Sequence, residues 1–470
     1  MHTKGTMNTN NRFSSLLLVI IAAVGLILPC LAGAAHAGTV NLPQTGQTTT
    51  YAAGDDGALQ MGVAWPNKRF TDNGDQTMTD NLTGLVWTKN ADTPTVGKCN
   101  GDTKKWQEAL DYVSCLNAAS YLGHNDWRLP NINELYSVVN EGVDYLEKWL
   151  NDQGFVNVKA LIYWSSTTYA YYTSYAWSVF LWSGGVYNSA KSGNCYVWPV
   201  RSGQSGTFGS SAIWSSGQTK SYAAGDDGAL HKGVAWPNPR FTDNNNNTVT
   251  DNLTGLVWTR DASTPTMDSC KGGNMSWQAA LDYVRCLNTA NYLGHKDWRL
   301  PNKKEMFSLL DRGKYDPPLP SGHPFIHVMR PYYYWSSTTD AGGTSGAWGI
   351  SMLAGKVSPI VKSNSPYVWP VHSGEVGNLV NLAISLSGTG SGTVISSTGT
   401  IIWSNNTGTA SYLPNTTVTL TATPNTTSTI GKWSGCDTVS SGQCTVKMMS
   451  NKTITVTFDT IKIIPRQKKR

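Results

Sequence analysis

The chain has 470 residues, enough for about three domains of ordinary size. Its formal net charge is +6, and charged residues make up 14% of the sequence. A charge this small and thinly spread excludes the strong positive field of a nucleic-acid-binding protein, so no nucleic-acid partner is expected.

The start of the chain, residues 1–37, is predicted to be a secretory signal peptide. A short basic start precedes an apolar run from Phe13 to Leu31, and Ala35-His36-Ala37 offers a cleavage site. A retained membrane anchor is the alternative, and Cys30 raises a lipoprotein, which the preceding Pro29 fits poorly. No other segment reaches the ~20 apolar residues of a membrane span, so the mature chain is expected to have no transmembrane segment. We expect a bacterial protein that is secreted or at the cell surface, with the periplasm as the alternative.

The body of the chain is a tandem duplication. Trp65 and Trp198 recur as Trp236 and Trp369, and they and five tryptophans between them are repeated after the same 171 residues. Because this period far exceeds the ~20 to 50 residues of solenoid repeats, each copy is expected to be an independent globular domain. Copy 1 is placed at residues 51–203 and copy 2 at 222–374. The Ser- and Gly-rich stretch 204–221 between them is predicted to be a flexible linker.

Within each copy the pattern predicts an α+β fold. Asn73-Gly74, in the middle of Arg69–Trp87, is typical of a hairpin turn between two strands. Apolar residues at helical spacing over Trp106–Leu116 predict a helix with one buried face. Asn131 and Glu134 form a capping-box pattern at the start of a second helix, and copy 2 repeats it. The second half of the copy is rich in loops, where binding residues often lie on a rigid scaffold.

The cysteines follow the same division. In an exported chain, close pairs with matched spacing indicate disulfides, and no zinc-type spacing accompanies them. Cys195 is left over as a free thiol, an intermolecular bridge or a small buried residue, and we favour the last. The expected disulfides are Cys99–Cys115, Cys270–Cys286 and Cys436–Cys444.

Four ordered motifs in each copy resemble the Lcl C-terminal domain family. In copy 1 they are TDNLTGLVW (79–87), DWRLPNINEL (126–135), YWSST (163–167) and YVWPVR (196–201). Copy 2 carries close counterparts of all four and departs at the last arginine, which is His372. This family is similar to the C-type lectin fold in the version shared with formylglycine-generating enzymes. The resemblance therefore implies two tandem C-type lectin-like domains that bind a glycan or a protein ligand at the cell surface.

The C-terminal segment, residues 380–459, is rich in Thr, Ser and Gly and contains alternating runs such as Val418–Pro424. It resembles the divergent internalin-type B-repeat of bacterial cell-surface proteins. The resemblance implies a small all-β module that acts as a spacer or accessory domain.

The candidate ligand-binding residues come from comparing the two copies. Between Trp164 and Lys191, copy 1 has aromatic side chains where copy 2 mostly has small ones. Large amphipathic rings contact much area at little entropy cost, and their faces suit stacking against sugar rings. The alternative is that these rings fill the core of a loop. The candidates are Tyr169, Tyr171, Tyr172, Tyr175, Trp182, Tyr187 and Asn188.

Two acidic groups in copy 1 are expected to be structural. Asp72, Asp75 and Asp80 have a spacing loosely like that of a calcium loop. A hairpin turn built from Asn, Asp and Gly explains them better, so no cofactor is expected, with calcium as the alternative. Asp126 is expected to form a buried pair with Arg128 beside the second helix.

No metal site is expected among the histidines. His323 and His327 stand four positions apart, which would align them on a helix, but Pro324 argues against one. His124 and His295 recur at the same place in the two copies, so we expect them to be structural.

The sequence as a whole predicts an adhesin-like binding protein rather than an enzyme, with two linked domains that gain avidity. No Ser-His-Asp arrangement, phosphate loop or carboxylate pair stands out at a recognisable spacing. One alternative is an enzyme like the formylglycine-generating enzymes, whose chemistry needs a reactive cysteine pair. The other is a structural cell-surface or matrix component without a specific ligand.

Overall fold

The computed structural model of the chain describes residues 40–202, 212–330, 332–373, 380–397, 401–412, 416–440, 442–449 and 451–461. The predicted signal peptide lies outside these residues. Within the described part, no helix combines the length and apolar character needed to cross a bilayer.

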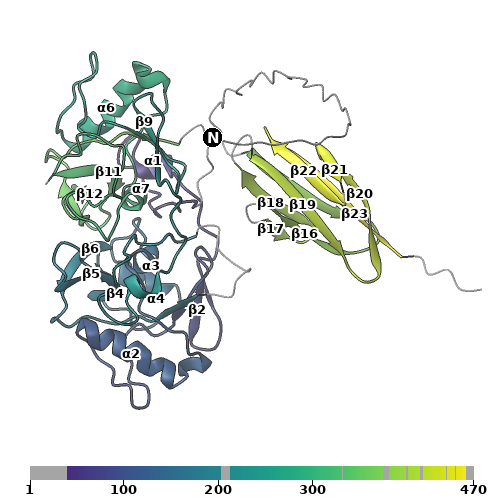
Figure 1. Cartoon of the computed structure of the whole chain (residues 1–470), viewed down its shortest axis with the longest axis horizontal. Coiled ribbons are helices and arrows are strands. Elements are labelled where there is room, and N and C mark those ends of the chain that lie inside the picture. Colours follow the sequence, from purple (N-terminus) through teal and green to yellow (C-terminus); the bar gives the residue numbers. More distant parts are fainter. Residues whose placement is uncertain are drawn as a thin grey trace, which may run out of the picture. The chain divides into compact units, whose positions relative to one another are not determined.

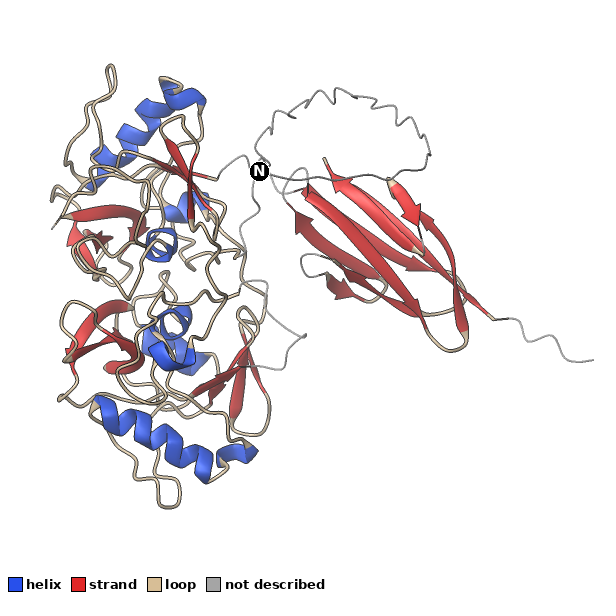
Figure 2. Ribbon diagram, in the orientation of Figure 1, coloured by secondary structure: helices blue, strands red, loops and turns tan. Residues whose placement is uncertain are grey.

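Copy 1 contains two antiparallel sheets and four α-helices (Figures 1 and 2). The first sheet has the order β1-β2-β3-β7, with β1 at Phe70–Asp72, β2 at Thr77–Asp80, β3 at Leu85–Thr88 and β7 at Val200–Ser202. The second contains β4 at Ile162–Thr168, β5 at Tyr175–Phe180 and β6 at Gly185–Ala190. The helices are α1 at Asp56–Leu59, α2 at Trp106–Ala118, α3 at Ile132–Ser137 and α4 at Leu146–Asp152, with a 3-10 turn, η1, at Tyr121–Gly123.

Copy 2 repeats this order of elements almost completely. Its sheets contain β8 at Phe241–Asp243, β9 at Thr248–Asp251, β10 at Val257–Thr259, β11 at Tyr333–Thr339, β12 at Gly346–Ser351, β13 at Val357–Val361 and β14 at Val371–His372. The helices are α5 at Asp227–Leu230, α6 at Trp277–Thr289 and α7 at Lys303–Ser308, with η2 at Tyr292–Gly294. The segment 317–323, at the position of α4, is not helical, because Pro318 and Pro320 disfavour the helical conformation of the residues that precede them.

The local signals in the sequence act as predicted. Asn131 begins α3 as its N-cap, and its side chain accepts from the Glu134 amide while the Glu134 carboxylate accepts from the Asn131 amide. The hairpin between β1 and β2 turns at Asn73-Gly74, where Gly74 has φ +78°. The predicted helix at Trp106 is α2, with one buried face.

The two copies pack against each other, whereas the sequence predicted two independent globular domains. Their second sheets join into one six-stranded sheet, β11-β12-β13-β6-β5-β4, in which Val186 of β6 lies opposite Val357 of β13. The rings of Tyr136 in α3 and Phe307 in α7 are 4.2 Å apart, and one hydrophobic cluster runs through both copies. Because both pairs join matching positions of the repeat, the copies are related by a pseudo-two-fold axis. Figure 1 shows α3 and α7 near this axis and α2 and α6 at opposite ends of the pair.

The segment before each copy forms an arm that contacts the other copy. Gln47 donates to the Thr339 carbonyl at 2.8 Å and accepts from the Thr339 amide at 3.0 Å. Gln218 makes the same two bonds with Thr168, at 2.7 and 2.9 Å. A glutamine amide offers a donor and an acceptor side by side, so each arm extends the hydrogen bonding at the end of a strand. Residues 212–221, the later part of the predicted linker, are therefore structured and packed.

Two buried carboxyl groups hold the arms in place. The Asp56 side chain accepts from the hydroxyls of Thr45 at 2.6 Å and Thr338 at 2.7 Å, which joins the first arm to copy 2. Asp227 accepts in the same way from Ser216 and from Thr167 of copy 1. Burial raises the pKa of both carboxyl groups to about 7.

A buried ion pair crosses between the copies. Lys303 of α7 lies 2.9 Å from the Glu141 carboxylate of copy 1, with side chains no more than 1% exposed, and its ammonium stands over the Trp348 ring. At the pseudo-symmetric position, Ile132 and Arg312 replace the pair. The Arg312 guanidinium packs over the Trp177 ring of copy 1 and donates to the Gly355 carbonyl at 2.8 Å. Each of these two buried tryptophans therefore has one cation from copy 2 against its face.

The C-terminal module is all-β in its described residues, as predicted (Figure 2). One sheet has the order β17-β18-β15-β23-β20, and the other has the order β16-β19-β22-β21. The two sheets enclose a hydrophobic core of their own. The strands are β15 at Val380–Ser387, β16 at Gly392–Ser396, β17 at Ile402–Ser404, β18 at Thr407–Tyr412, β19 at Thr416–Pro424, β20 at Ser428–Ser434, β21 at Thr438–Ser440, β22 at Gln443–Met448 and β23 at Lys452–Thr460.

The cysteine predictions are confirmed. The structure forms the disulfides Cys99–Cys115, Cys270–Cys286 and Cys436–Cys444. Cys195 is a free thiol that is buried, as favoured, and its backbone pairs with that of Lys104.

The buried ion pair leads to a stability prediction. Glu141→Ala should lower the free energy of unfolding by ~3–5 kcal/mol, because it leaves the Lys303 ammonium buried without its carboxylate. Glu141→Leu combined with Lys303→Met should recover most of that loss, since it removes both charges. Urea denaturation followed by tryptophan fluorescence measures both. Lys148→Ala, which breaks an exposed pair with Asp152, is the control and should change stability little. An equal loss in Glu141→Ala and Lys148→Ala would contradict the prediction.

The arm carboxyls predict a pH dependence. The folded protein keeps protons on Asp56 and Asp227 that the unfolded chain releases above pH about 4, so these groups destabilise the fold as the pH rises from about 4 to about 7. Asp56→Asn with Asp227→Asn should flatten this part of the profile, because asparagine keeps an oxygen for the hydroxyl donors and does not titrate. Melting temperatures across this range test it. Parallel profiles for wild type and variant would show that the two carboxyls do not titrate as described.

Candidate binding surface

The residues predicted to bind ligand, which are mostly aromatic, differ in burial: some are exposed, some half-buried and one buried. They lie in the turn between β4 and β5, on β5 and β6, and in the turn between those two strands. Tyr171, Tyr172 and Trp182 are 36%, 56% and 43% exposed. Tyr175, Tyr187 and Asn188 are half-buried, whereas Tyr169 is buried.

Tyr169 belongs to the core rather than to the surface. Its ring is 4% exposed and packs edge-on against the Trp177 ring, with centroids 5.0 Å apart. Its counterpart in copy 2 is Asp340, so this position differs between the copies without facing solvent in copy 1. We therefore remove Tyr169 from the candidate binding residues, because a ligand at the surface could contact little of its ring.

Three of the remaining rings form a cluster with a tyrosine of copy 2. The Tyr171 ring lies 4.4 Å from that of Tyr172 and 5.1 Å from that of Tyr315, and Tyr172 lies 6.4 Å from Tyr175. We call these four residues the tyrosine surface. Sequence reasoning missed Tyr315, because no feature of copy 2 showed that its loop lies against the rings of copy 1.

Polar groups adjoin the tyrosine surface. Asp316 follows Tyr315 and pairs with Arg330 at 2.8 Å, and both side chains are nearly half exposed. The hydrogen bond with Tyr172 raises the pKa of Tyr171, and the negative charge of Asp316 adds to this effect. Tyr171 therefore keeps its hydroxyl proton at neutral pH. The surface combines flat aromatic faces with hydroxyl, carboxylate and guanidinium groups.

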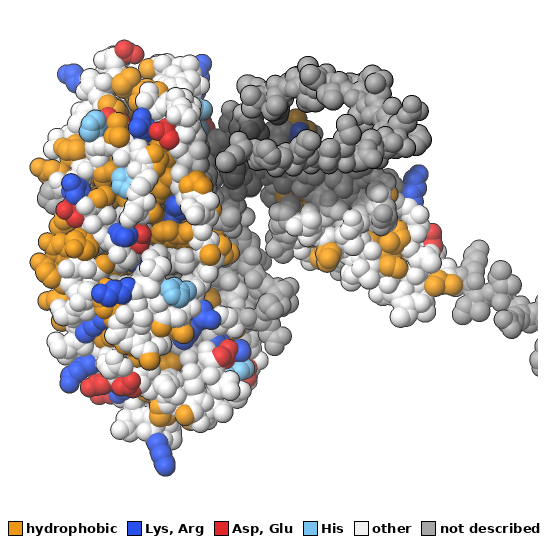
Figure 3. All heavy atoms as spheres, in the orientation of Figure 1, with side chains coloured by type: hydrophobic (Ala, Val, Ile, Leu, Met, Phe, Trp, Pro, Cys, Tyr) orange, Lys and Arg blue, Asp and Glu red, His pale blue; other side chains and the backbone are white. Residues whose placement is uncertain are grey.

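The pseudo-symmetric surface has the opposite character. Gly342, Gly343 and Gly346 stand where copy 1 has its tyrosines, and a methyl group added at Gly342 would lie 3.3 Å from the Asp144 carbonyl oxygen. Asp144 of copy 1 completes what we call the glycine surface, and the exposed Tyr145 follows it in the chain. The same framework therefore presents rings at one boundary between the copies and small residues at the other. On the face shown in Figure 3, charged side chains of both signs are scattered over the repeat pair instead of forming one patch.

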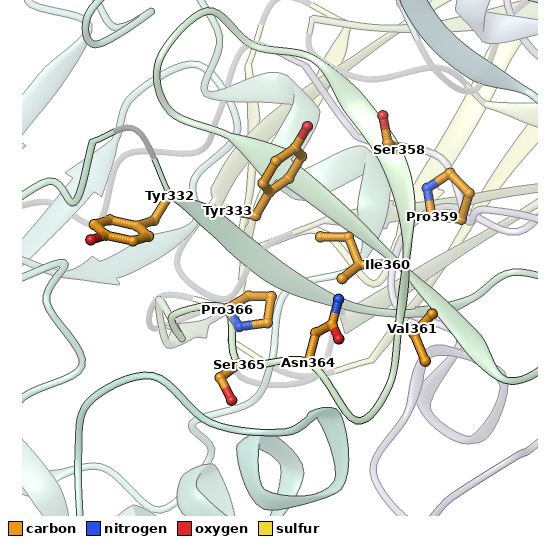
Figure 4. Close-up of a pocket in the computed structure, with 9 residues that line it drawn as sticks. All are labelled: Tyr332, Tyr333, Ser358, Pro359, Ile360, Val361, Asn364, Ser365 and Pro366. Carbon is orange, nitrogen blue, oxygen red and sulfur yellow. The ribbon is translucent and has the colours of Figure 1, made fainter.

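Tyr187 and Asn188 lie at the seam between the two copies, on β6. The Tyr187 hydroxyl is hydrogen-bonded with Ser358 of β13. Ser358 also lines an open hollow of about 520 Å³, which is formed by the start of β11, by β13 and by residues 364–366 (Figure 4). Trp182 lies elsewhere, in the turn before β6, where its carbonyl accepts from the Leu146 amide. These three candidates are therefore not part of the tyrosine surface.

The acidic residues with calcium-like spacing are all used by the hairpin and its neighbours. Asp72 pairs with Lys89 at 2.6 Å, and Asp75 accepts from Thr77. Asp80 is buried and pairs with Arg69 at 2.7 Å. These contacts agree with the hairpin interpretation.

The expected pair of Asp126 with Arg128 is wrong. Arg128 makes a two-pronged pair with Glu134 at the start of α3, because that carboxylate already lies beside it as part of the helix cap. Asp126 instead pairs with Arg201 of β7 at 2.7 Å.

The histidine pair in copy 2 contacts separate groups. His327 lies 3.0 Å from Asp261, whereas the His323 ring packs near Phe325.

The comparisons with known families agree with this architecture. The model of the Lcl C-terminal domain matches residues 76–201 and 247–372, which together make up just over half of the chain. The chain belongs to the Lcl C-terminal domain family. Residues 384–462 match the divergent InlB B-repeat domain, and the two families together indicate a bacterial surface protein. No curated protein matches the chain. Copies 1 and 2 are called Lcl domains 1 and 2 below.

The division between core and surface rings in Lcl domain 1 can be tested. Tyr169→Ala should lower the free energy of unfolding by ~2–4 kcal/mol, because it removes a buried ring and leaves a cavity beside Trp177. Tyr172→Ala should change it by no more than about 0.5 kcal/mol, because that ring is largely exposed. Urea denaturation measures both variants. Similar losses would place the two rings in the same environment and contradict the assignment.

Proposed function

We propose that this bacterial surface protein binds a glycan through the tyrosine surface, which is built from both Lcl domains. The main support for this function is the exposed cluster of Tyr171 and Tyr172 with Tyr315 of the other domain. Aromatic faces stack against the apolar faces of sugar rings, and rigid tyrosines lose little conformational entropy on binding. Asp316 and Arg330 stand beside the rings and offer an acceptor and donors for sugar hydroxyls.

We expect each chain to have one glycan-binding surface. Tethered domains could bind independently and gain avidity, but residues 212–221 are packed against Lcl domain 1 and the two domains share a core. The glycine surface at the pseudo-symmetric boundary lacks the corresponding rings. We therefore expect a binding stoichiometry of one glycan site per chain.

We infer a binding role rather than catalysis. Chemistry like that of the formylglycine-generating enzymes needs a reactive cysteine pair, and the paired cysteines of both Lcl domains form disulfides. Burial raises the pKa of the remaining thiol, Cys195, to about 11, which is opposite to the lowered pKa of an activated nucleophile. These observations support the binding proposal over the enzyme alternative.

We infer that each Lcl domain is a variant of the C-type lectin-like fold, in which a long helix and small antiparallel sheets support a loop-rich half. We also infer that residues 1–37 direct export, which the three disulfides support because such bonds persist in oxidising compartments.

A glycan array tests the function, with Tyr171→Ala/Tyr172→Ala and Tyr315→Ala compared with wild type. Each variant should reduce the affinity for the best glycan on the order of 10-fold or more, because losing an anchoring ring costs about 2 kcal/mol. Tyr145→Ala is the control, since it removes an exposed tyrosine that follows Asp144 of the glycine surface. Equal losses in Tyr145→Ala and Tyr315→Ala would contradict the site. Binding to host-matrix proteins without any glycan binding would replace the glycan by a protein ligand, and no binding to either would favour a structural component.

A further inference from the structure

Three side chains with metal-ligand chemistry meet in Lcl domain 2. His295 follows η2, Asp297 lies in the loop after it, and His372 lies in β14. Their ligand atoms all lie within 4.8 Å of one another. An Asp297 oxygen is 3.5 Å from His372 Nδ1, and the other is 3.9 Å from His295 Nδ1. The two imidazole rings lie at 30° to each other with centroids 4.1 Å apart.

The two separations from the Asp297 carboxylate lie near that of a tetrahedral zinc site. Zinc bonds of about 2.0–2.1 Å to His nitrogen and carboxylate oxygen place neighbouring ligand atoms ~3.4 Å apart. Asp297 is 58% exposed, so its carboxylate can turn to shorten the longer separation. Two imidazole nitrogens with one carboxylate suit Zn²⁺ and similar first-row ions, whereas Ca²⁺ and Mg²⁺ favour oxygen ligands.

Lcl domain 1 provides a direct comparison at the same place. It keeps His124 and Asp126, but Arg201 stands where domain 2 has His372. The Arg201 guanidinium donates to the Asp126 carboxylate at 2.7 Å. A fixed cation therefore faces the aspartate in domain 1. In domain 2 the histidine removes that fixed charge and adds a ligand nitrogen, and a bound metal ion would restore the positive charge.

We propose that Lcl domain 2 binds one divalent transition-metal ion, with Zn²⁺ the best fit, through His295, Asp297 and His372, and that Lcl domain 1 does not. The His372 side chain is 2% exposed and Asp297 lies at the surface, so the ion enters from solvent and keeps a coordination position open for water. The ion joins the loop after η2 to β14, which pairs with β10. Zinc binding therefore raises the melting temperature of the repeat pair.

Isothermal titration of the untagged mature chain with Zn²⁺, after treatment with a chelator, tests the proposal. Wild type should bind one equivalent at micromolar concentration or below. His372→Arg should lose this binding and still fold, because domain 1 accommodates an arginine at the same place. Asp297→Asn changes an exposed side chain, and it should weaken zinc binding at least ~10-fold without loss of folding. Unchanged zinc stoichiometry in His372→Arg, or no zinc binding by wild type, would overturn the proposal.

The reverse variant provides the matched control. Arg201→His should give domain 1 the same three ligands and raise the zinc stoichiometry to two, and adding His124→Ala should return it to one. His124→Ala alone should leave the wild-type titration unchanged. Co²⁺ in place of Zn²⁺ gives a second readout, because a site of this kind shows visible absorption bands that His372→Arg should lack. A zinc stoichiometry of one in a folded Arg201→His would show that this position does not decide metal binding.

Discussion

The exchange of arms between the two Lcl domains is the constraint on which the rest of the structure depends. Gln47 makes two hydrogen bonds with the last backbone unit of β11 in domain 2, and Gln218 does the same with that of β4 in domain 1. Because side-chain amides take the place of a neighbouring strand, these hydrogen bonds cannot form unless the domains are already side by side. The arms therefore join the two domains, which share a six-stranded sheet and one hydrophobic cluster.

Buried charges make this unit asymmetric. Lys303 of domain 2 pairs with Glu141 of domain 1, whereas Arg312 of domain 2 packs over the Trp177 ring of domain 1 and Ile132 stands at the position that matches Lys303. Two copies of domain 2 in the same arrangement would bring Lys303 and Arg312 together without the Glu141 carboxylate, and two copies of domain 1 would bury Glu141 beside Ile132. Since an unpaired buried charge costs several kcal/mol, the substitutions favour pairing of unlike domains.

The same asymmetry separates the surfaces. The framework residues recur, but one boundary presents Tyr171 and Tyr172 with Tyr315, and the other presents Gly342 and Gly343 beside Asp144. Comparing the sequences of the two copies identified Tyr171 and Tyr172, because their counterparts in copy 2 are glycines. It could not assign Tyr169 to the core, because a ring that varies between copies gives the same signal whether it faces solvent or Trp177. It could not find Tyr315, since neighbours across a pseudo-two-fold axis leave no spacing along the chain.

The sequence by itself determined the duplication, the capping boxes, the hairpin turns, the three disulfides and the all-β C-terminal module. These features depend on local propensity, on repeated spacing and on matched cysteines, all of which can be read along the chain. Only the tertiary structure decided that the copies share a core, that residues 212–221 form an arm instead of a linker, and that Arg128 pairs with Glu134. It also brought His295, Asp297 and His372 together. Those outcomes depend on contacts between residues far apart in sequence. Such contacts exist only once the two copies have packed against each other, or once β14 lies beside the loop after η2.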